Sequence, residues 1–328
     1  MQNILKEAIV DKKVFRYSKA NNDSINSVHI AFGVDAGYVL GMGTAMTSIV
    51  VNNPNMEFIF HVFVSSIDTD DLNRLEHLAE QYQLTMNLYY VNNCVFNQMP
   101  TFGYYSPAIY NRLLIAEALR NTAEKVLYLD ADIICLGNIK EFIETDLSDH
   151  IIAVVHDIES TSMKQIKSLQ LKQARYFNSG VIYLNIKKWN EHDVSSQAMA
   201  LIQQHYSEFS CPDQDALNIL LAEHTLYVDR KWNVIYDLTG KYEELPAGTV
   251  FLHYTARLKP WCKWCVHPVK SYFIQYYEQS PWARISLPDP SSSTEMRLCA
   301  RLLARERRYS DAIFWYCRYL ITKMKNKL

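Results

Sequence analysis

Two aspartates one residue apart form the most chemically suggestive pattern in the sequence. Asp130 and Asp132 directly follow an apolar run at residues 126–129 that is typical of a buried strand. Side chains two residues apart share one face of a strand, so both carboxylates should leave it on the same side. Ligands of open α/β sheets bind beyond the carboxyl ends of the strands. Carboxylate pairs suit a hard divalent cation that in turn holds a phosphate. We therefore predict a metal site here rather than a plain acidic turn.

A histidine further along the chain is a candidate third ligand. His253 follows a short apolar run and precedes a basic loop that contains Arg257 and Lys259. A lone histidine on an apolar strand is more often a core residue than a ligand. The neighbouring Arg257 and Lys259 favour a ligand role for the histidine, because cations beside a metal ligand suit a diphosphate. An imidazole added to two carboxylates would shift metal preference from Mg²⁺ toward Mn²⁺. At a strand end we expect both acids to be partly exposed and to repel each other.

Apolar runs alternate with helical patterns along the first half of the chain. The predicted strands are 28–35, 57–65, 84–91, 151–157 and 177–186, and the predicted helices are 69–82 and 106–121. Asp68 is suited to cap the first helix, and Pro107 is suited to the first turn of the second. This alternation predicts an α/β fold with a sheet that is largely parallel at its start.

Further polar residues stand at the ends of these elements. They are Asp35, Asp157, Asn178, Asp213 and Gln214. Small residues around Asp35, in the turn 33–38, would let a nucleotide approach the backbone, although an ordinary tight turn explains them equally well. Helix capping alone explains Asp213 near the start of the segment 212–218. It does not explain the glutamine that follows.

Charge is distributed unevenly along the chain. The protein has 328 residues, 49% of them hydrophobic, and a formal net charge of −2, which suits either one large domain or one large domain with an appendage. Residues 295–328 hold nine basic and three acidic residues, so a basic tail follows an acidic body. An acidic body argues against a broad nucleic-acid surface. No apolar run is long enough for a signal peptide core or a membrane span, so we expect a cytoplasmic protein.

The basic tail predicts contact with a membrane. We expect an amphipathic helical segment that rests on the anionic inner face of the cytoplasmic membrane as a peripheral partner. Its apolar and interfacial groups would be Leu298, Leu302, Ile313, Trp315, Tyr316, Tyr319 and Leu320. The alternative is a helical cap that packs on the catalytic domain with its charges solvated.

Six segments in order resemble a known family. They are GVDAGY (33–38), YNRL (110–113), YLDAD (128–132), YFNSGVIYLNIKKW (176–189), PDQDALN (212–218) and HYTARLKPW (253–261). Together they resemble family 8 of the retaining glycosyltransferases, and more closely its bacterial lipopolysaccharide core glucosyl- and galactosyltransferases. The resemblance covers about residues 28 to 285.

The resemblance implies a fold and a domain organisation. The fold would be GT-A, an α/β fold with a Rossmann-like nucleotide-binding half and a mixed sheet. We expect a lead-in at 1–27, the GT-A catalytic domain at 28–286, a linker at 287–294 and the basic amphipathic helical tail at 295–328.

The resemblance also implies residue roles. Asp130, Asp132 and His253 would bind one Mn²⁺ or Mg²⁺ ion. Lys259 would meet the diphosphate, and the turn 33–38 would hold uracil and ribose. The full set of implied donor-binding residues is Gly33, Val34, Asp35, Ala36, Gly37, Tyr38, Arg112, Asp130, Ala131, Asp132, Asn178, His253 and Lys259. The implied catalytic residues, beside the donor hexose, are Gln214, Asp157 and Asp213.

Three positions depart from the family pattern. Relatives often have asparagine where Gly37 stands, glycine where Arg257 stands and histidine where Cys262 stands. The first departure concerns a ribose contact. The second removes a backbone contact to phosphate and adds a cation in its place. We assign no role to Cys262.

The implied reaction is metal-dependent hexosyl transfer. UDP-glucose or UDP-galactose would be the donor, a sugar hydroxyl of the lipopolysaccharide outer core the acceptor, and the product an α-glycosidic bond. A retaining hydrolase uses a carboxylate nucleophile, but Gln214 offers an amide, so we prefer front-face attack with the departing phosphate as base. The alternatives are a family 8 enzyme that acts on another glycan or a protein, and a non-catalytic nucleotide- or sugar-binding module.

Overall fold

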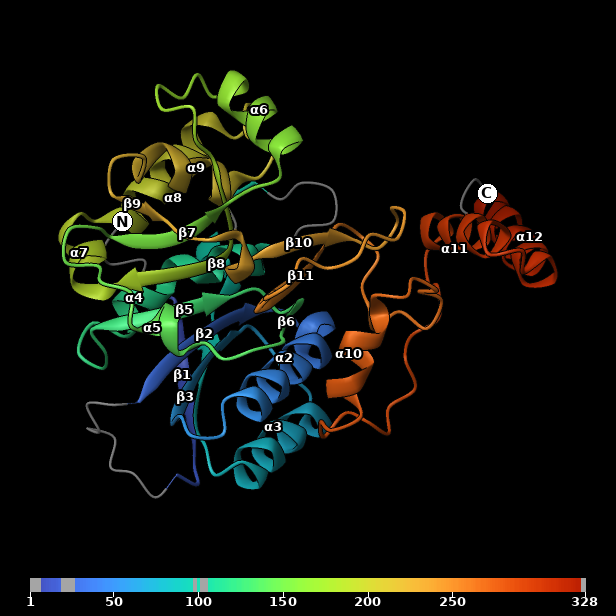
Figure 1. Ribbon diagram of the computed structural model, residues 1–328, viewed down its shortest axis with the longest axis horizontal. Helices are drawn as coiled ribbons and strands as arrows, with labels where there is room; N and C mark the ends of the chain where they lie inside the picture. Colours follow the sequence, from blue (N-terminus) through green and yellow to red (C-terminus); the bar gives the residue numbers. More distant parts are fainter. Residues whose placement is uncertain (1–6, 19–26, 97–98, 101–105, 326–328) are drawn as a thin grey trace.

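A computed structural model describes residues 7–18, 27–96, 99–100 and 106–325. Its centre is a mixed eight-stranded sheet with helices on both faces (Figure 1). In spatial order the strands are β1 (Ile9–Arg16), β4 (Thr85–Val91), β3 (Phe58–Val64), β2 (Val28–Val34), β5 (Lys125–Leu129), β8 (Phe177–Asn185), β7 (Ile152–His156) and β9 (Thr225–Tyr227). Strands β1 and β8 run antiparallel to their neighbours. The carboxyl ends of the others therefore meet along one edge.

A second sheet joins distant parts of the chain near that edge. It consists of β10 (Val234–Asp237), β11 (Phe251–Thr255) and β6 (Ile133–Cys135), in that order. Strand β11 pairs antiparallel with β6, and the register sets His253 opposite Ile133. Because Ile133 directly follows Asp132, this pairing brings the histidine to the acidic pair.

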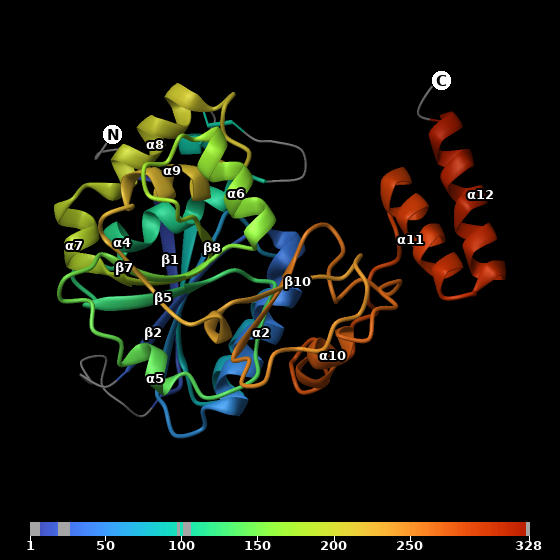
Figure 2. The same cartoon turned by 45° about the horizontal axis from the view of Figure 1, so that its top comes forward.

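Helices cover both faces of the main sheet (Figures 1 and 2). The α-helices are α2 (Val39–Asn52), α3 (Thr69–Gln81), α4 (Ile115–Ala118), α5 (Lys140–Ile143), α6 (Glu159–Ser168), α7 (Ile186–Glu191), α8 (Val194–His205), α9 (Pro212–Leu220), α10 (Lys270–Tyr277), α11 (Ser293–Arg305) and α12 (Tyr309–Lys325). The 3₁₀ helices are η1 (Ala36–Tyr38), η2 (Asn93–Phe96), η3 (Pro107–Leu114) and η4 (Arg230–Trp232).

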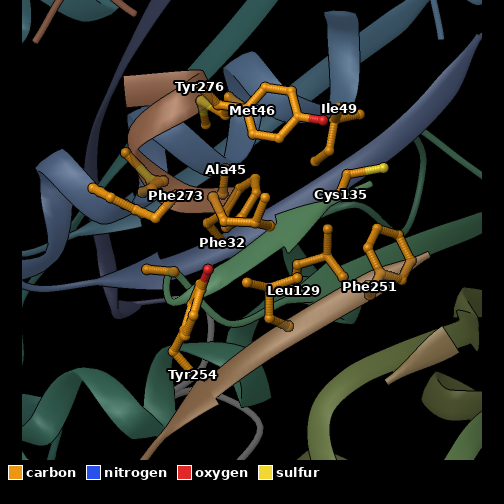
Figure 3. Close-up of a cluster of buried hydrophobic side chains, with 14 of the residues drawn as sticks. Phe32, Ala45, Met46, Ile49, Leu129, Cys135, Phe251, Tyr254, Phe273 and Tyr276 are labelled. Carbon is orange, nitrogen blue, oxygen red and sulfur yellow. The ribbon is translucent and has the colours of Figure 1, made fainter. Parts of the chain in front are cut away.

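The main sheet separates two hydrophobic cores. Along β2, Ile30 and Phe32 belong to the core that contains α2 and α3, whereas Ala31 belongs to the core that contains α8 and α9. Figure 3 shows part of the first core, where Phe32, Leu129 and Phe251 come from both sheets. Strands buried on both faces are apolar at nearly every position. For this reason they stand out as apolar runs in the sequence.

The predicted α/β architecture and its strands are confirmed. The runs at 28–35, 57–65 and 84–91 form β2, β3 and β4, which pair in parallel. The runs at 151–157 and 177–186 form β7 and β8. The sheet is therefore largely parallel at its start, as expected, with β2 to β5 parallel and the antiparallel strands β1 and β8 beside them.

One helix prediction is confirmed and another is only partly right. Helix α3 begins after Asp68, whose side chain accepts the N–H of Asp71. The segment predicted as a single α-helix at 106–121 is mostly the 3₁₀ helix η3, and only residues 115–118 are α-helical. The physical reason lies in the cavity at the carboxyl edge of the sheet, which Ser106, Ile109 and Arg112 all line. Residues three apart are aligned in a 3₁₀ helix but not in an α-helix.

The segment expected as a lead-in contributes to the sheet. Residues 9–16 form β1, an edge strand that pairs antiparallel with β4. Of its residues only Phe15 is buried, so its sequence lacks the apolar pattern by which the other strands were predicted. Residues 1–6 and 19–26 of this segment lie outside the described part of the chain.

The expected helical tail consists of two helices. Helices α11 and α12 form a hairpin to the side of the main sheet (Figures 1 and 2). Ser292 and Glu295 form a capping box at the start of α11. The chain turns between the helices, where Arg307 has a φ of +60°. Residues 326–328 lie outside the described residues.

A partly buried and a fully buried histidine lie side by side in the main sheet. Nδ1 of His29 is 2.9 Å from Nε2 of His61, and the rings stack. Nδ1 of His61 is 3.3 Å from the Tyr89 hydroxyl, and His61 is fully buried. Burial lowers the pKa of both histidines, and the positive charges of His29 and Lys12 add to the effect on His61.

We expect the free energy of unfolding to fall as the pH is lowered through about 6.5. Both histidines have a lower pKa in the folded protein, so the unfolded chain binds more protons below that pH. Between its folded and unfolded pKa, each histidine adds a slope of at most about 1.4 kcal/mol per pH unit to the free energy of unfolding. Above pH ~6.5 it adds none. Denaturant unfolding at a series of pH values measures this slope. His61→Phe should flatten it, and His77→Gln, at an exposed position, should not. An unchanged slope in His61→Phe would contradict this explanation.

Candidate active site

A cavity of about 320 Å³ opens at the carboxyl edge of the main sheet. It is lined by residues that follow β2, β5 and β7, by the beginning of β8 and by the loop after β11. The predicted site residues that line it are Gly33, Val34, Asp35, Tyr38, Arg112, Asp130, Ala131, Asp132, Asp157, Asn178, Asp213, Gln214, His253 and Lys259. The tertiary structure thus brings together segments that are separated by most of the chain.

Two residues of the predicted nucleotide turn do not line the cavity. Ala36 and Gly37 belong to η1, the single turn that leads into α2. The Gly37 N–H donates to Asp35 Oδ1 over 2.9 Å, and the Ser106 hydroxyl donates to Asp35 Oδ2 over 2.6 Å. The turn therefore fixes the Asp35 carboxylate at the cavity wall.

The two aspartates and the histidine converge as predicted for a metal site. Nε2 of His253 lies 3.2 Å from Oδ1 of Asp132 and 3.8 Å from Oδ2 of Asp130. One ligand atom of each residue lies within 4.8 Å of the others. Within the described ranges, no other group of three His, Cys, Asp or Glu side chains meets this condition. Two carboxylate oxygens and an imidazole nitrogen suit Mn²⁺, and the carboxylates also suit Mg²⁺.

Gly180 lets these side chains approach the main chain of β8. A Cβ atom at this position would lie 2.3 Å from Cε1 of His253 and 2.9 Å from Oδ2 of Asp130. Neither neighbour could move without disrupting the cluster of Asp130, Asp132 and His253. Residue 180 must therefore be glycine, because any side chain would clash with these two neighbours. This requirement holds whatever backbone angles the residue adopts.

The acidic pair is neutralised by buried cations, contrary to the expectation of simple repulsion. Arg112 contacts Asp130 with Nη2 and Asp213 with Nε, each over 3.0 Å. Nζ of Lys259 lies 2.6 Å from Oδ2 of Asp132. The side chains of Asp130 and Asp132 are 26% and 11% exposed. They are thus more enclosed, and better paired, than a strand end alone predicts.

These pairs set the protonation states of the cluster. Burial by itself would raise the pKa of Asp132, but Lys259 and His253 outweigh it and hold that pKa well below its ordinary value. Burial would lower the pKa of Lys259, but the neighbouring Asp132 outweighs it and raises that pKa. For Asp213, burial dominates and raises the pKa despite the Arg112 charge. The carboxylate of Asp132 is therefore charged at neutral pH, as a metal ligand must be.

A second polar cluster forms the opposite part of the cavity wall. The Ser179 N–H donates to Oε1 of Gln214 over 2.8 Å. Nε2 of Gln214 donates to Oδ2 of Asp157 over 2.9 Å and to the Tyr176 hydroxyl over 3.0 Å. Tyr176 in turn donates to Oδ1 of Asp215 over 2.5 Å. Gln214 is thus held in one orientation, with its nitrogen toward Asp157 and its oxygen toward the main chain of β8.

Several residues of the cavity wall were not predicted from the sequence. They are Ser106, Ala108, Ile109, Tyr128, Ile158, Thr161, Ser179, Cys211, Ile235, Thr255 and Ala256. Most are small or apolar and carry no chemical signature of their own. The three-residue spacing of Ser106, Ile109 and Arg112 could have indicated a shared 3₁₀ face. It was not recognised because the segment was predicted to be an α-helix.

The loop after β11 differs from the expectation based on the family pattern. Ala256 is the residue with a left-handed backbone, at a φ of +65°. This conformation favours glycine. The expected departure from glycine was Arg257, one residue later. Arg257 does not line the cavity. The cation of this loop that lines it is Lys259.

We expect Asp132→Asn to abolish Mn²⁺ binding and to lower the free energy of unfolding by about 3 kcal/mol, because it leaves the Lys259 charge buried without its partner. The double variant Asp132→Asn/Lys259→Met should regain most of the stability and still bind no Mn²⁺. Calorimetric titration and denaturant unfolding measure the two effects. Asp70→Asn, at an exposed position on α3, is the control. Wild-type stability in the single variant would show that the ion pair is not a structural constraint.

Known proteins match this chain over most of its length. The model for glycosyl transferase family 8 matches residues 29–265, and the model for the family 8 C-terminal region matches residues 267–323. A lipopolysaccharide 1,2-glucosyltransferase of Escherichia coli K12 is 32% identical over 330 residues, which cover 97% of this chain and 98% of that protein. A lipopolysaccharide 1,3-galactosyltransferase of Salmonella typhimurium LT2 is 30% identical over 329 residues, with the same coverage of both chains.

The fold is that of a solved glycosyltransferase. The galactosyltransferase LgtC, in complex with donor and acceptor sugar analogues, superimposes with a TM-score of 0.68 at 22% identity. The match covers 77% of this chain and 96% of LgtC. It confirms the predicted GT-A architecture. The family match across both its catalytic and C-terminal regions shows that the chain belongs to glycosyl transferase family 8.

Proposed function

We propose that this glycosyltransferase transfers glucose or galactose from a UDP-sugar to a sugar hydroxyl of the lipopolysaccharide outer core, with formation of an α-glycosidic bond. The observation that carries the proposal is one cavity that joins a metal-ligand triad, a buried lysine and a carboxylate–amide cluster. Those three parts match the nucleotide diphosphate and the sugar of such a donor. The acceptor class is supported by the two lipopolysaccharide glycosyltransferases that align over 97% of the chain.

The nucleotide would lie along the end of β2. Gly33, Val34, Asp35 and Tyr38 form this wall, and Tyr38 packs edge-on against Trp261 at a centroid distance of 5.4 Å. Burial raises the pKa of Tyr38 to about 12, so its hydroxyl remains a hydrogen-bond donor at neutral pH. Asp35, held by the turn, would accept hydrogen bonds from uracil or ribose.

The diphosphate would lie between the metal triad and Lys259. A divalent cation held by Asp130, Asp132 and His253 would supply Lewis-acid stabilisation of the charge that grows on departing UDP. The Lys259 ammonium contacts Asp132 and also donates to the Tyr254 carbonyl over 2.9 Å. Held in this way, it would place a second fixed positive charge beside the phosphates.

The donor hexose would lie over Asp157, Asp213 and Gln214. Both lone pairs of the Gln214 carbonyl are used, because Ser179 donates to it with its N–H and with its hydroxyl. We therefore assign Gln214 chiefly to holding Asp157, whose carboxylate would offset the positive charge that develops on the sugar. An amide in this position cannot serve as a nucleophile, so we propose front-face attack, with the leaving phosphate taking the proton of the acceptor hydroxyl.

The proposal extends to the membrane because α12 has an apolar outer face. Within the hairpin Leu302 and Tyr319 are buried, and Leu298 and Trp315 are partly buried against the core. Four of the seven residues predicted for membrane contact thus face inward. The exposed apolar residues of α12 are Tyr309, Ile313, Phe314, Tyr316, Leu320, Ile321 and Met324. Their spacing places them on the side of α12 away from α11.

Basic residues flank this apolar face. Arg318, Lys323 and Lys325 are exposed on α12, and each basic residue near an anionic surface contributes roughly 1 kcal/mol to binding. A helix with this distribution suits the interface of a membrane. Arg305 ties the hairpin to the body by donating to the carbonyls of Thr239 and Gly240. No helix of the described chain is long and apolar enough to cross a membrane. We propose peripheral binding to the inner face of the cytoplasmic membrane, on the cytoplasmic side.

We expect hexosyl transfer to truncated lipopolysaccharide cores with UDP-glucose or UDP-galactose, and with a requirement for Mn²⁺ or Mg²⁺. Incubation with a panel of UDP-sugars and cores, followed by NMR of the product, identifies the donor and the linkage. Chelation and the Asp132→Asn variant should remove activity. Undiminished transfer after metal stripping would refute the metal assignment, and transfer only to a protein or another glycan would refute the acceptor class.

We expect Ile313→Ser/Leu320→Ser/Ile321→Ser to reduce binding to vesicles rich in phosphatidylglycerol while soluble UDP-sugar hydrolysis persists. The substitutions remove exposed apolar area from α12 and leave the buried face of the hairpin intact. Vesicle co-sedimentation at low and high salt measures the effect. Val10→Ser/Val14→Ser is the matched control, since these exposed residues lie on β1, at the opposite edge of the molecule from the tail. Equal binding by both variants would show that α12 is not the contact surface.

A further inference from the structure

Asn233 is a buried amide beside the metal triad that the sequence patterns did not single out. It is 1% exposed and lies between η4 and β10. Strand β10 pairs in parallel with β11, with Ile235 opposite His253. Side chains two residues apart share one face of a strand. The pairing of the two strands therefore brings Asn233 to the histidine ring.

The main chain of β8 determines how the neighbouring amide of Asn178 is oriented. The Gly180 N–H lies 3.0 Å from Oδ1 of Asn178. A backbone N–H only donates, so the atom that faces it must be the carbonyl oxygen of the side chain. Asn233 contacts this same oxygen over 2.9 Å with Nδ2. Because the oxygen only accepts, Asn233 must present its NH₂ group there.

The orientation of Asn233 then determines the tautomer of His253. With its NH₂ group toward Asn178, Asn233 turns Oδ1 toward Nδ1 of His253, at 3.1 Å. A carbonyl oxygen cannot donate, so Nδ1 must carry the proton, and the lone pair of the neutral ring is then on Nε2. Nε2 is the atom that lies 3.2 Å from Oδ1 of Asp132.

We infer that Asn233 is a positioning residue that holds His253 in the tautomer able to bind the metal through Nε2. This inference rests on the proposed metal dependence. Neither amide atom of Asn233 is among the buried polar atoms of the described chain that lack a partner, and the orientation of Asn178 is fixed independently by the Gly180 N–H. Partners that orient metal-binding histidines in this way typically change metal affinity by about ten- to a hundredfold.

The same amide connects the metal triad to the sugar side of the cavity. Nδ2 of Asn178 donates to Oδ2 of Asp157 over 3.3 Å, and Gln214 donates to the same oxygen. A chain of hydrogen bonds with one fixed direction thus runs from His253 through Asn233 and Asn178 to Asp157. Removing Asn233 breaks this chain in its middle, so catalysis should suffer as well as metal binding.

The test compares two substitutions of Asn233 that separate the hydrogen bond it accepts from the one it donates. Asn233→Leu removes both hydrogen bonds at similar size, whereas Asn233→Asp can still accept the Nδ1 proton of His253 but cannot donate to Asn178. Mn²⁺ titration of the full-length protein without sugar should show a ten- to hundredfold loss for Asn233→Leu, and affinity within about threefold of wild type for Asn233→Asp. The kcat of Asn233→Asp should fall, because its link to Asn178 is lost.

A control and a spectroscopic readout distinguish positioning from general loss of stability. Asn53→Leu removes another amide that is 1% exposed and hydrogen-bonded to the main chain of residues 49, 137 and 139, far from His253. It should lower stability and leave Mn²⁺ affinity unchanged. Long-range ¹H–¹⁵N NMR of the metal-free imidazoles should show Nδ1–H for His253 in wild type and Asn233→Asp, and loss of this preference in Asn233→Leu.

The outcomes separate this inference from the proposed function. Wild-type Mn²⁺ affinity together with an unchanged tautomer in Asn233→Leu would overturn the inference. If Asn233→Leu does not fold, Asn233→Asp decides, since loss of both Mn²⁺ binding and the Nδ1–H tautomer in that variant would also overturn it. Failure of the wild-type protein to bind Mn²⁺ would instead refute the proposed metal dependence. The tautomer measurements would still test the role of Asn233.

Discussion

The pairing of buried charge around Arg112 is the constraint on which the rest of the site depends. Its guanidinium is 8% exposed and contacts Asp130, Asp213 and both the carbonyl and the hydroxyl of Ser179. It also lies over the Tyr128 ring at 4.6 Å. An unpaired charge at this depth would be strongly destabilising. The end of β5, the start of β8 and the start of α9 are therefore held at fixed positions by one side chain.

The direction of β8 explains why the site is built from strand ends and a strand beginning. This strand runs antiparallel to β5 and β7, so its first residues lie at the edge where theirs end. The N–H groups of Ser179 and Gly180 then point to Gln214 and Asn178 and set the orientation of both amides. The proposed metal ligands and the proposed sugar-side cluster thus share a rigid backbone support. A catalytic geometry needs such support, because small displacements of catalytic groups are costly.

The C-terminal hairpin shows how one helix can carry two apolar faces with different roles. Tyr319 is buried on one side of α12, whereas Ile313 and Leu320 are exposed on the other side. Composition alone cannot divide such residues between the two faces, because every one of them is apolar or aromatic. The division depends on which side of α12 packs against α11, and this is set by the turn around Arg307.

By itself the sequence determined the buried strands, the acidic pair at the end of β5 and the family, because apolar runs and ordered motifs are local signals. It could not reveal the ion pairs of Lys259 and Arg112, since their partners come from other segments and only packing excludes water from them. The 3₁₀ helix at 107–114 was missed because tertiary contacts overrode local helix preference. Asn233 was missed because its partners, like those of Lys259 and Arg112, come from other segments of the chain. A single asparagine carries no pattern, and its importance arises only when the pairing of β10 with β11 sets it between His253 and Asn178, whose orientation the Gly180 N–H determines.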